Sequence, residues 1–180
     1  MKTLTLLRHA KSGWDDPTLR DFDRPLNAKG QRAAQVVGRH WKTLGLTFDR
    51  IVASPAVRVV ETLEHIGRGY GQTLEPEWDK RLYLASVASL VDVIQEQSDS
   101  VDRLLLVGHN PGLEELVLTL VPLAGDNPAR ADVEEKFPTA SLAEMAFDID
   151  RWSDAGADRA TLARFIRPRD LDPALGPGAD

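Results

Sequence analysis

The sequence predicts an α/β domain built on a mostly parallel sheet. Short apolar runs suited to strands alternate along the chain with longer segments whose apolar residues have helical spacing. This alternation is typical of folds in which helices cover a parallel sheet. The length of 180 residues fits a single domain that buries a core of its own. The apolar fraction of 42% and the charged fraction of 28% are those of an ordinary globular protein.

The elements of the first half follow in order. Residues 3–7 are apolar and β-prone, and we expect them to form a buried strand. Residues 27–44 carry apolar side chains on one helical face, and Gly45 is suited to end that helix. Residues 51–53 form a short strand that stops at a Ser-Pro pair. The proline can occupy the first position of a helix, which we expect over residues 55–66.

The second half continues the alternation. Ser86 can cap a helix that runs to about Gln97, with its apolar residues inward. Residues 104–107 are uninterrupted leucine and valine, the pattern of a strand buried on both faces. A Gly-His-Asn-Pro sequence ends that strand, and residues 112–121 are expected to form the next helix. Residues 142–147 and 161–166 are predicted as two further strands.

Three segments are expected to lack regular structure or to break it. Residues 67–71 hold three glycines and are expected to stop a helix and turn the chain. Residues 122–138 show no clear periodicity and are interpreted as a surface excursion. We expect the domain to span residues 1–167, and residues 168–180, rich in Pro, Gly, Ala and Asp, to form a poorly ordered tail.

Composition excludes several classes of function. The chain has no cysteine, which excludes a disulfide scaffold, a cysteine-based zinc site, an iron–sulfur cluster and a cysteine nucleophile. The net charge of −6 argues against a nucleic-acid partner. No apolar stretch approaches the ~20 residues that a membrane span needs. Arg8 and His9 interrupt the first apolar run too early for a signal peptide, so we expect a cytoplasmic protein without a membrane partner.

Two predicted strand ends carry arginine and histidine. Arg8 and His9 directly follow the first strand, and His109 follows the strand over residues 104–107. Arg58 comes about one helical turn after the strand over residues 51–53. Ligands of open α/β sheets bind beyond the carboxyl ends of the strands, so these four side chains are expected to face one crevice. Two guanidinium groups and two imidazoles suit a compact anion, and phosphate is the natural candidate.

The ordered set of motifs resembles the histidine phosphatase superfamily, also called the phosphoglycerate-mutase-like family. The motifs are Arg8-His9-Ala10, the segment Ser54-Pro55-Ala56-Val57-Arg58 and Gly108-His109-Asn110. The small size and the Arg24-Pro25-Leu26 segment resemble most its SixA-type phosphohistidine phosphatase branch. The resemblance covers roughly residues 1–166. It implies a three-layer α/β fold with a mostly parallel central sheet flanked by helices.

The resemblance also implies a mechanism. His9 acts as the nucleophile and forms a phosphohistidine intermediate, while Arg8, Arg58 and His109 hold the phosphoryl oxygens. Ser12 and Asn110 are expected to contact the anion as well. Arginine and histidine supply the positive charge, so no metal and no other cofactor is expected. The implied substrate is a phosphorylated protein or a small phosphorylated metabolite.

The chain departs from the family pattern at two points. Ala10 stands where the larger family usually has glycine, a small change that the turn should tolerate. Many relatives have a glutamate between the second arginine and the second histidine that acts as proton donor. No glutamate stands there in this chain, and Asp79 is the nearest acid. SixA-type members are similar in lacking an evident acid, which favours a labile phosphoramidate over a sugar phosphate.

Several other residues have plainer interpretations. His40 and His65 lie within predicted helices and match no motif, and the four histidines lack the spacing of a zinc site. Asp23 and Arg24 are expected to pair and order their loop. Trp14 follows the nucleophile and either lines the pocket rim or covers the core.

The sequence therefore favours a metal-independent phosphatase that acts on protein phosphohistidine through phosphorylated His9. One alternative is a small-molecule phosphomonoesterase of the same fold. A second is a non-catalytic module that binds phosphate or a phosphoprotein, which the absence of the glutamate keeps open.

Overall fold

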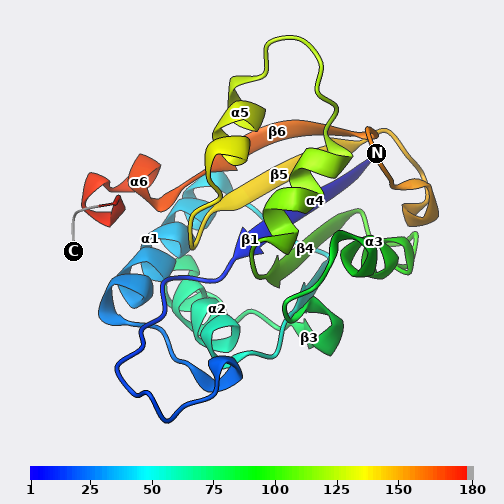
Figure 1. The fold of residues 1–180 in the computed structure, drawn as a ribbon. Helices are drawn as coiled ribbons and strands as arrows, with labels where there is room; N and C mark the ends of the chain where they lie inside the picture. Colours follow the sequence, from blue (N-terminus) through cyan, green and yellow to red (C-terminus); the bar gives the residue numbers. More distant parts are fainter. Residues whose placement is uncertain (178–180) are drawn as a thin grey trace.

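Strands from both halves of the chain form one sheet in the order β3-β2-β4-β1-β5-β6 (Figure 1). The computed structural model describes residues 1–177. The strands are β1 (Lys2–Arg8), β2 (Arg50–Ala53), β3 (Glu77–Trp78), β4 (Arg103–Gly108), β5 (Leu142–Phe147) and β6 (Ala160–Ile166). All five strands predicted from the sequence are present, and the two-residue strand β3 was not predicted.

The sheet is mixed, with a parallel half that carries the site. Strand β1 is parallel to β4, β4 to β2, and β2 to β3. Strand β5 is antiparallel to β1, and β6 is antiparallel to β5. Arg8 is in register with Gly108, and Ala53 with Val107. The carboxyl ends of β1, β4 and β2 therefore meet at one edge of the sheet, as the fold prediction requires.

Helices cover both faces of the sheet and complete three layers (Figure 1). They are α1 (Ala28–Leu44), α2 (Val57–Tyr70), α3 (Val87–Gln95), α4 (Gly112–Leu120), α5 (Pro128–Glu135) and α6 (Pro168–Leu171). Short 3-10 turns are η1 (Asp21–Asp23), η2 (Lys80–Leu82), η3 (Trp152–Asp154) and η4 (Pro173–Leu175). Of the described helices, α3, α4 and α5 pack on one face and α1, α2 and α6 contribute to the other.

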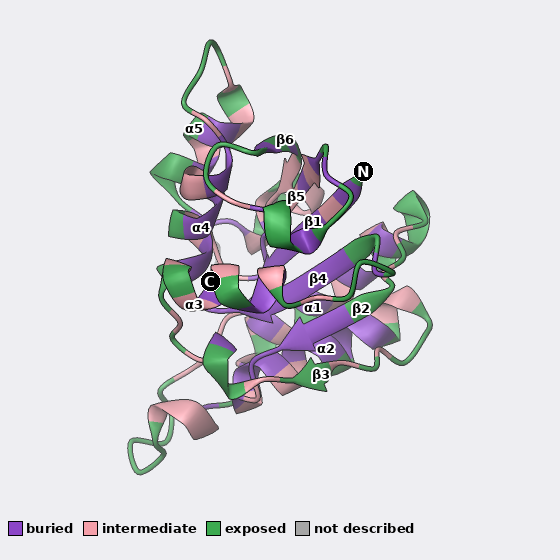
Figure 2. Cartoon of the chain, turned by 90° about the vertical axis from the view of Figure 1, so that its right-hand side faces the viewer, coloured by how far each residue is buried: buried purple, intermediate pink, exposed green. Residues whose placement is uncertain are grey.

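Alternation along the central strands explains the two cores. Leu4 and Leu6 of β1 face the core under α3 and α4, while Leu7 faces the core under α1 and α2. Strand β4 alternates in the same way, with Leu104 and Leu106 on the first face. Successive side chains of a strand point to opposite faces, so a strand buried on both faces is apolar throughout. Figure 2 shows the central strands buried between the helical layers.

The predicted helix ends are confirmed where the caps are strong. The Asn27 side chain accepts a hydrogen bond from the Gly30 backbone N–H at 2.8 Å, and Gly45 ends α1 with a φ of 66°. Ser86 caps α3 in the same way, accepting from the Ser89 backbone N–H at 3.2 Å. These side chains satisfy the donors that the first helical turn leaves unpaired.

Helix α2 continues past the point where the sequence predicted its end. It runs through Gly67 and Gly69 to Tyr70, and Gly71 ends it with a φ of 82°. The expectation that residues 67–71 form a turn is therefore wrong for most of the segment. A Cβ on Gly69 would lie 2.1 Å from the Gln35 carbonyl oxygen of α1. This glycine serves the close contact between the two helices, which local sequence rules do not register.

The segment 122–138 is only partly an irregular excursion. It contains α5, which begins at an Asn127 cap and buries Val133 against the core. The Arg130 side chain donates to the carbonyl oxygens of Val121 at 3.0 Å and Leu118 at 3.1 Å. These bonds tie α5 to the end of α4. With two buried residues, the helix shows little apolar periodicity, so the pattern in the sequence was weak.

The expected tail is ordered over residues 168–177. Helix α6 and turn η4 follow β6, and Leu171 and Leu175 pack against the core under α1. The Lys29 ammonium group donates to the Gly176 carbonyl oxygen at 3.0 Å. The rest of the predicted tail, residues 178–180, lies outside the described residues. Within residues 1–177, no helix has both the length and the apolar character needed to cross a bilayer.

Candidate active site

A cavity of about 350 Å³ lies at the edge of the sheet where β1 and β4 end. The structure brings together in it all four side chains predicted to carry the chemistry: Arg8, His9, Arg58 and His109. The same cavity is lined by Ser12 and Asn110, the two predicted anion contacts, and by Lys11, Trp14, Asp21, Arg24, Leu84 and Thr139. Three segments distant in sequence therefore supply one compact polar site.

The imidazole of His9 is held in one tautomer. Its Nδ1 lies 2.6 Å from the Ala10 carbonyl oxygen. A carbonyl oxygen can only accept, so Nδ1 carries the proton and Nε2 keeps its lone pair. The His9 side chain is buried, and its ring centre lies 5.2 Å from that of His109. His9 thus presents an unprotonated nitrogen within the arginine- and histidine-lined cavity.

The charge state of His9 follows from burial. Burial lowers its pKa to about 3, against a hydrogen bond to Ala10 that raises it. The neighbouring His109, Arg8 and Arg58 lower it further because they disfavour another positive charge. His9 is therefore neutral at physiological pH, which is the form that a nitrogen nucleophile needs.

His109 lies between a serine and an arginine. Its Nδ1 lies 3.3 Å from an Arg58 guanidinium nitrogen and its Nε2 lies 2.8 Å from Ser54 Oγ. Arginine can only donate, so Nδ1 accepts and the proton is on Nε2. Burial, followed by the charge of Arg58, lowers the His109 pKa to about 3. Ser54 thus orients His109.

The two arginines of the site are anchored but keep donor capacity. Arg58 is 3% exposed and donates to the Asp21 backbone oxygen at 2.7 Å and to its carboxylate at 3.0 Å. Arg8 donates to the Phe137 carbonyl oxygen at 2.9 Å. The Nε atoms of Arg8 and Arg58 are buried and have no hydrogen-bond partner among residues 1–177. Phosphoryl oxygens are the acceptors that such guanidinium groups pair with best.

Asp21 is a site residue that sequence reasoning missed. Its carboxylate accepts from Arg24 at 3.0 Å, from Arg58 at 3.0 Å and from the Tyr83 hydroxyl at 2.6 Å. Burial raises the Asp21 pKa, but these three hydrogen bonds outweigh it and bring the pKa to about 2. Asp21 is therefore ionised, and it holds the side chains of Arg24 and Arg58. Its position three residues before Arg24 was the available signal, since that spacing favours an ion pair in a helical turn.

The loop after β1 is ordered by Arg24. The expected pair of Asp23 with Arg24 is wrong, because Asp23 accepts from Arg20 at 2.9 Å and Arg24 pairs with Asp21. Arg24 also donates to Ser12 Oγ at 2.7 Å, and its guanidinium carbon lies 3.7 Å from the centre of the Trp14 ring. Trp14, which is 66% exposed, therefore lies at the rim of the cavity and does not cover the core.

Thr62 is a second missed residue, and it connects two of the predicted motifs. Its hydroxyl donates to the Arg58 carbonyl oxygen one turn earlier in α2 and accepts from the Ala10 backbone N–H at 2.9 Å. The residue after His9 is thus fastened to the helix that carries Arg58. Its location one helical turn after Arg58 was the signal available in the sequence.

Two further predicted residues have different surroundings. Asn110 lines the cavity, but its amide donates to the Phe137 carbonyl oxygen at 3.0 Å and its side-chain oxygen accepts from the Glu114 N–H at 3.2 Å. Asp79 does not line the cavity. Its carboxylate accepts from the Arg81 side chain at 2.8 Å, and this hydrogen bond lowers the Asp79 pKa. A proton donor needs a raised pKa, so position and charge both disfavour Asp79 as the acid.

The remaining polar candidates lie elsewhere. His65 is buried in α2, and its Nδ1 lies 3.0 Å from Nε2 of Gln35. Neither His65 nor His40 lines the cavity. Among residues 1–177 there is no group of three or more His, Asp or Glu side chains arranged to hold a metal ion.

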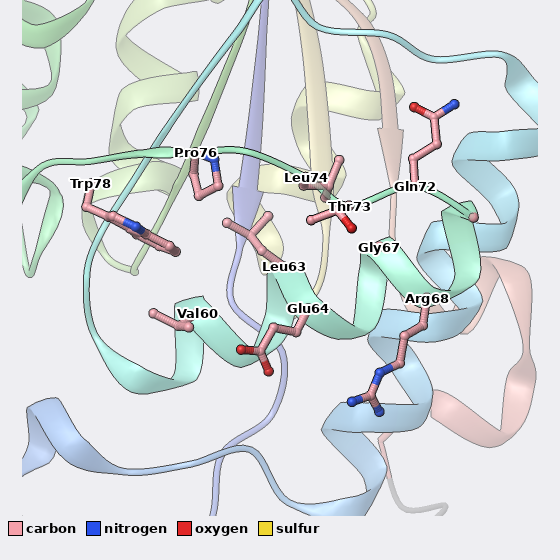
Figure 3. A pocket seen from close by; sticks show the side chains of 11 residues that line it. Val60, Leu63, Glu64, Gly67, Arg68, Gln72, Thr73, Leu74, Pro76 and Trp78 are labelled. Atoms are coloured by element: carbon pink, nitrogen blue, oxygen red, sulfur yellow. The ribbon is translucent and has the colours of Figure 1, made fainter.

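A larger cavity, of about 610 Å³, lies between the outer face of α2 and the segment that leads to Trp78 (Figure 3). It contains no histidine, and its charged side chains are Glu64 and Arg68.

The sequence matches a known family. The model of the histidine phosphatase superfamily (branch 1) matches residues 4–83. An uncharacterized protein of Mycobacterium tuberculosis is 33% identical over 164 residues, which are 91% of this chain and all of that protein. A protein of Mycobacterium leprae is 31% identical over 167 residues, again 91% of this chain and all of the relative.

Solved structures share the fold over nearly the whole chain. A protein of Agrobacterium tumefaciens, provisionally assigned as the phosphohistidine phosphatase SixA, superposes with a TM-score of 0.77 at 28% identity, over 93% of this chain and 98% of its own. Its counterpart from Nakamurella multipartitia gives 0.77 at 26% identity, over 93% and 96%. The protein histidine phosphatase SixA in complex with tungstate gives 0.76 at 21% identity, over 94% and 99%, which shows the fold alone.

Proposed function

The chain belongs to the histidine phosphatase superfamily, and we propose that it hydrolyses protein phosphohistidine through a phosphorylated His9. The observation that carries the proposal is the neutral His9, with Nε2 unprotonated, in a cavity lined by Arg8, Arg58 and His109. The Agrobacterium tumefaciens and Nakamurella multipartitia structures, whose names describe phosphohistidine phosphatases, support the choice of substrate.

The proposed reaction has two steps. In the first, the substrate imidazole is already protonated by solvent on its second ring nitrogen. His9 Nε2 attacks phosphorus, the N–P bond of the substrate breaks, and a neutral imidazole leaves with that proton. In the second, a water oxygen attacks the same phosphorus, the bond to Nε2 breaks, and inorganic phosphate leaves with the protons of the water. His9 returns to its starting tautomer because the Ala10 carbonyl oxygen keeps the proton of Nδ1 in place.

The arginines carry the charge of the transferred group in this proposal. Arg8 and Arg58 donate to the phosphoryl oxygens, and their guanidinium groups are already anchored at Phe137 and Asp21. Such anchoring lowers the cost of reorganisation when charge develops in the transition state. A bound dianion raises the pKa of His109, which allows its Nδ1 to become a donor to the same group. These groups take the place of a metal ion.

The acids of the cavity favour a labile substrate. Of the described residues that line it, Asp21 is the one carboxylic acid, and its pKa of about 2 makes it a poor proton donor. An alkoxide leaving group needs such a donor, whereas an imidazole leaves readily once protonated. The site is therefore better suited to a phosphoramidate than to an alkyl phosphate.

The rim of the cavity favours a protein substrate. Trp14 is 66% exposed and Leu84 is 58% exposed, and both line the cavity. Leu84 has a φ of 49°, a conformation that leucine rarely adopts. Backbone strain of this kind occurs often at functional sites. Two exposed apolar side chains at the mouth provide contacts that a protein surface can cover and an isolated phosphate cannot.

The test is phosphate release in the presence of a chelator from a phosphohistidine protein and from p-nitrophenyl phosphate. We expect wild type to turn over the phosphoramidate faster, and His9→Ala to lose activity by a factor of about 10³ or more on both. The matched control is His40→Ala, a histidine of α1 outside the cavity, which should keep wild-type rates. Denaturing wild type in alkaline detergent during turnover should trap phosphate on His9, because the N–P bond is stable in base and labile in acid.

Other results decide against parts of the proposal. Faster turnover of p-nitrophenyl phosphate would favour the small-molecule phosphomonoesterase. Phosphate binding without turnover would favour the non-catalytic module. Activity that survives in His9→Ala would remove the nucleophile assignment, and activity abolished by the chelator would remove the metal-independent mechanism. A cytoplasmic location stays a prediction.

A further inference from the structure

A second cavity with many cationic side chains adjoins the catalytic one. Its volume is about 420 Å³, and it lies between the start of α1 and the segment that follows β6. We call it the basic annex. Six cationic residues line it: Arg8, Lys11, Lys29, Lys136, Arg167 and Arg169. This concentration of positive charge occurs in a chain whose net charge is −6.

The annex and the catalytic cavity share part of their walls. Arg8, Lys11 and Thr139 line both of them. Because Arg8 lines both cavities, a ligand with its phosphoryl group at His9 lies close to the annex. The far wall is formed by the ordered C-terminal segment, including Pro168, Leu175 and Gly176. The annex therefore exists only because residues 168–177 pack against the domain.

Among residues 1–177, carboxylates act on Arg8, Arg167 and Arg169 of the annex. Asp170 is paired with Arg167 at 3.0 Å, and Asp132 and Glu135 also act on Arg167 through longer-range attraction. Asp170 attracts Arg169 only at longer range. Within residues 1–177, the side chains of Lys136 and Arg169 form no hydrogen bond or ion pair. A concave surface with charge of one sign concentrates ions of the opposite sign.

We propose that the basic annex binds a second anionic group of the substrate, a phosphate or a carboxylate, while the phosphoryl group to be removed lies at His9. The proposal names a feature of the substrate and so rests on the proposed function. A cavity of about 420 Å³ accommodates one compact oxyanion with its linker. Lysine and arginine are the side chains that recognise such a group.

The first experiment measures binding and needs no turnover. Calorimetry compares α,ω-alkanediol bisphosphates of two to six carbons with the matching alkyl monophosphates, for the full chain at low salt. We expect one bisphosphate length to bind about tenfold more tightly than its monophosphate, because it reaches both cavities. The advantage should shrink as salt is added. Equal affinity at every length would overturn the proposal.

The variants locate the second group. Lys136→Gln combined with Arg169→Gln should remove most of the bisphosphate advantage and leave monophosphate affinity unchanged, since neither residue lines the catalytic cavity. The matched control is Arg68→Gln. Arg68 is an exposed arginine of α2 that lines the cavity beside Trp78 and neither the annex nor the catalytic cavity (Figure 3). An equal loss in the control, or no loss in the double variant, would overturn the assignment to the annex.

A kinetic arm identifies the source of the anionic group. Two phosphohistidine peptides differ only in flanking Asp or Asn residues. A lower KM for the Asp peptide in wild type, lost in the double variant, assigns the group to a carboxylate of a protein substrate. A preference confined to the bisphosphates assigns it to a small molecule. If no phosphohistidine substrate is turned over, the proposed function fails, while the calorimetry still decides whether the annex binds anions.

Discussion

A single hydrogen bond prepares His9 for its proposed role. The Ala10 carbonyl oxygen accepts from Nδ1, which assigns the lone pair to Nε2, and burial keeps the ring neutral. His109 has the opposite tautomer, because Arg58 faces its Nδ1 and Ser54 accepts from its Nε2. Neither tautomer can be read from residue spacing, since both depend on backbone and side-chain partners that the fold supplies.

The residue scale also shows what the sequence could and could not identify. Arg8, His9, Arg58 and His109 were predicted to meet because they follow strand ends that a parallel sheet brings to one edge. Asp21 and Thr62 were missed because each acts through other site residues and stands in no motif. Asp79 was named as the nearest possible acid from its sequence position alone, whereas its carboxylate is occupied by Arg81.

Leu84 provides a prediction at this scale. Replacing Leu84 by Asn removes an exposed apolar contact at the mouth and suits the φ of 49° better, since asparagine tolerates the left-handed region. We expect Leu84→Asn to raise KM for a phosphohistidine protein about threefold or more and to leave p-nitrophenyl phosphate kinetics unchanged. The unfolding free energy should stay constant or rise by about 1 kcal/mol.

The control for this prediction is Leu123→Asn, a leucine that is 82% exposed and does not line the cavity. It should change neither kinetic constant. A change in KM that is equal for the protein and for p-nitrophenyl phosphate would mean that Leu84 acts on the phosphoryl site and not on the protein substrate.

The contact between α1 and α2 determines how the elements around the site are arranged. A Cβ on Gly38 would lie 2.1 Å from the Ile66 carbonyl oxygen, as one on Gly69 would from Gln35. Helix propensity alone predicts that Gly38→Ala stabilises the protein by about 1 kcal/mol. The close contact should reverse that sign, with a net loss of about 2 kcal/mol or more in urea denaturation, because overpacked backbones must move apart.

Gly156→Ala serves as the comparison for this substitution, since its added Cβ would meet no atom within 4 Å. We expect its effect on the unfolding free energy to lie within about 0.5 kcal/mol. Stabilisation by Gly38→Ala would show that the two helices can separate without cost, which contradicts the packing argument.

The sequence predicted elements best where their signals were local. Capped helices and apolar strands were located within a few residues, as for α1 and β5. The errors arose where distant contacts decide the structure. Helix α2 has Gly69 where α1 crosses it, α5 depends on Arg130 bonding to the end of α4, and α6 depends on Leu171 packing on the core. Strand β3, two residues long, forms only because β2 offers an edge.

At the scale of the whole molecule, the neutral histidines link the site to acid stability. His9 has an ordinary pKa of 6.5 that burial lowers to about 3 in the folded protein. Between these values the unfolded chain binds a proton that the folded protein does not, so stability rises with pH and is lost as the pH falls from about 6.5 toward 3. His9→Gln should reduce this slope by about 1.4 kcal/mol per pH unit.

The measurement is the unfolding free energy of wild type and His9→Gln from urea titrations at several values between pH 4 and pH 7. His109, whose pKa also falls to about 3, remains in the variant, so a reduced slope should persist. Parallel curves for the two proteins would show that His9 titrates alike in the folded and unfolded states.

The two ends of the described chain lie far apart, which matters for attaching the protein to a sensor surface (Figure 1). Met1 precedes β1, whose seven residues separate it from the catalytic cavity by about 20 Å at the usual rise per residue. The C-terminal segment, by contrast, forms a wall of the basic annex. A protein attached to the surface through its amino end therefore keeps the catalytic cavity and the basic annex accessible to a ligand in solution. Attachment through the carboxyl end places the surface next to the annex.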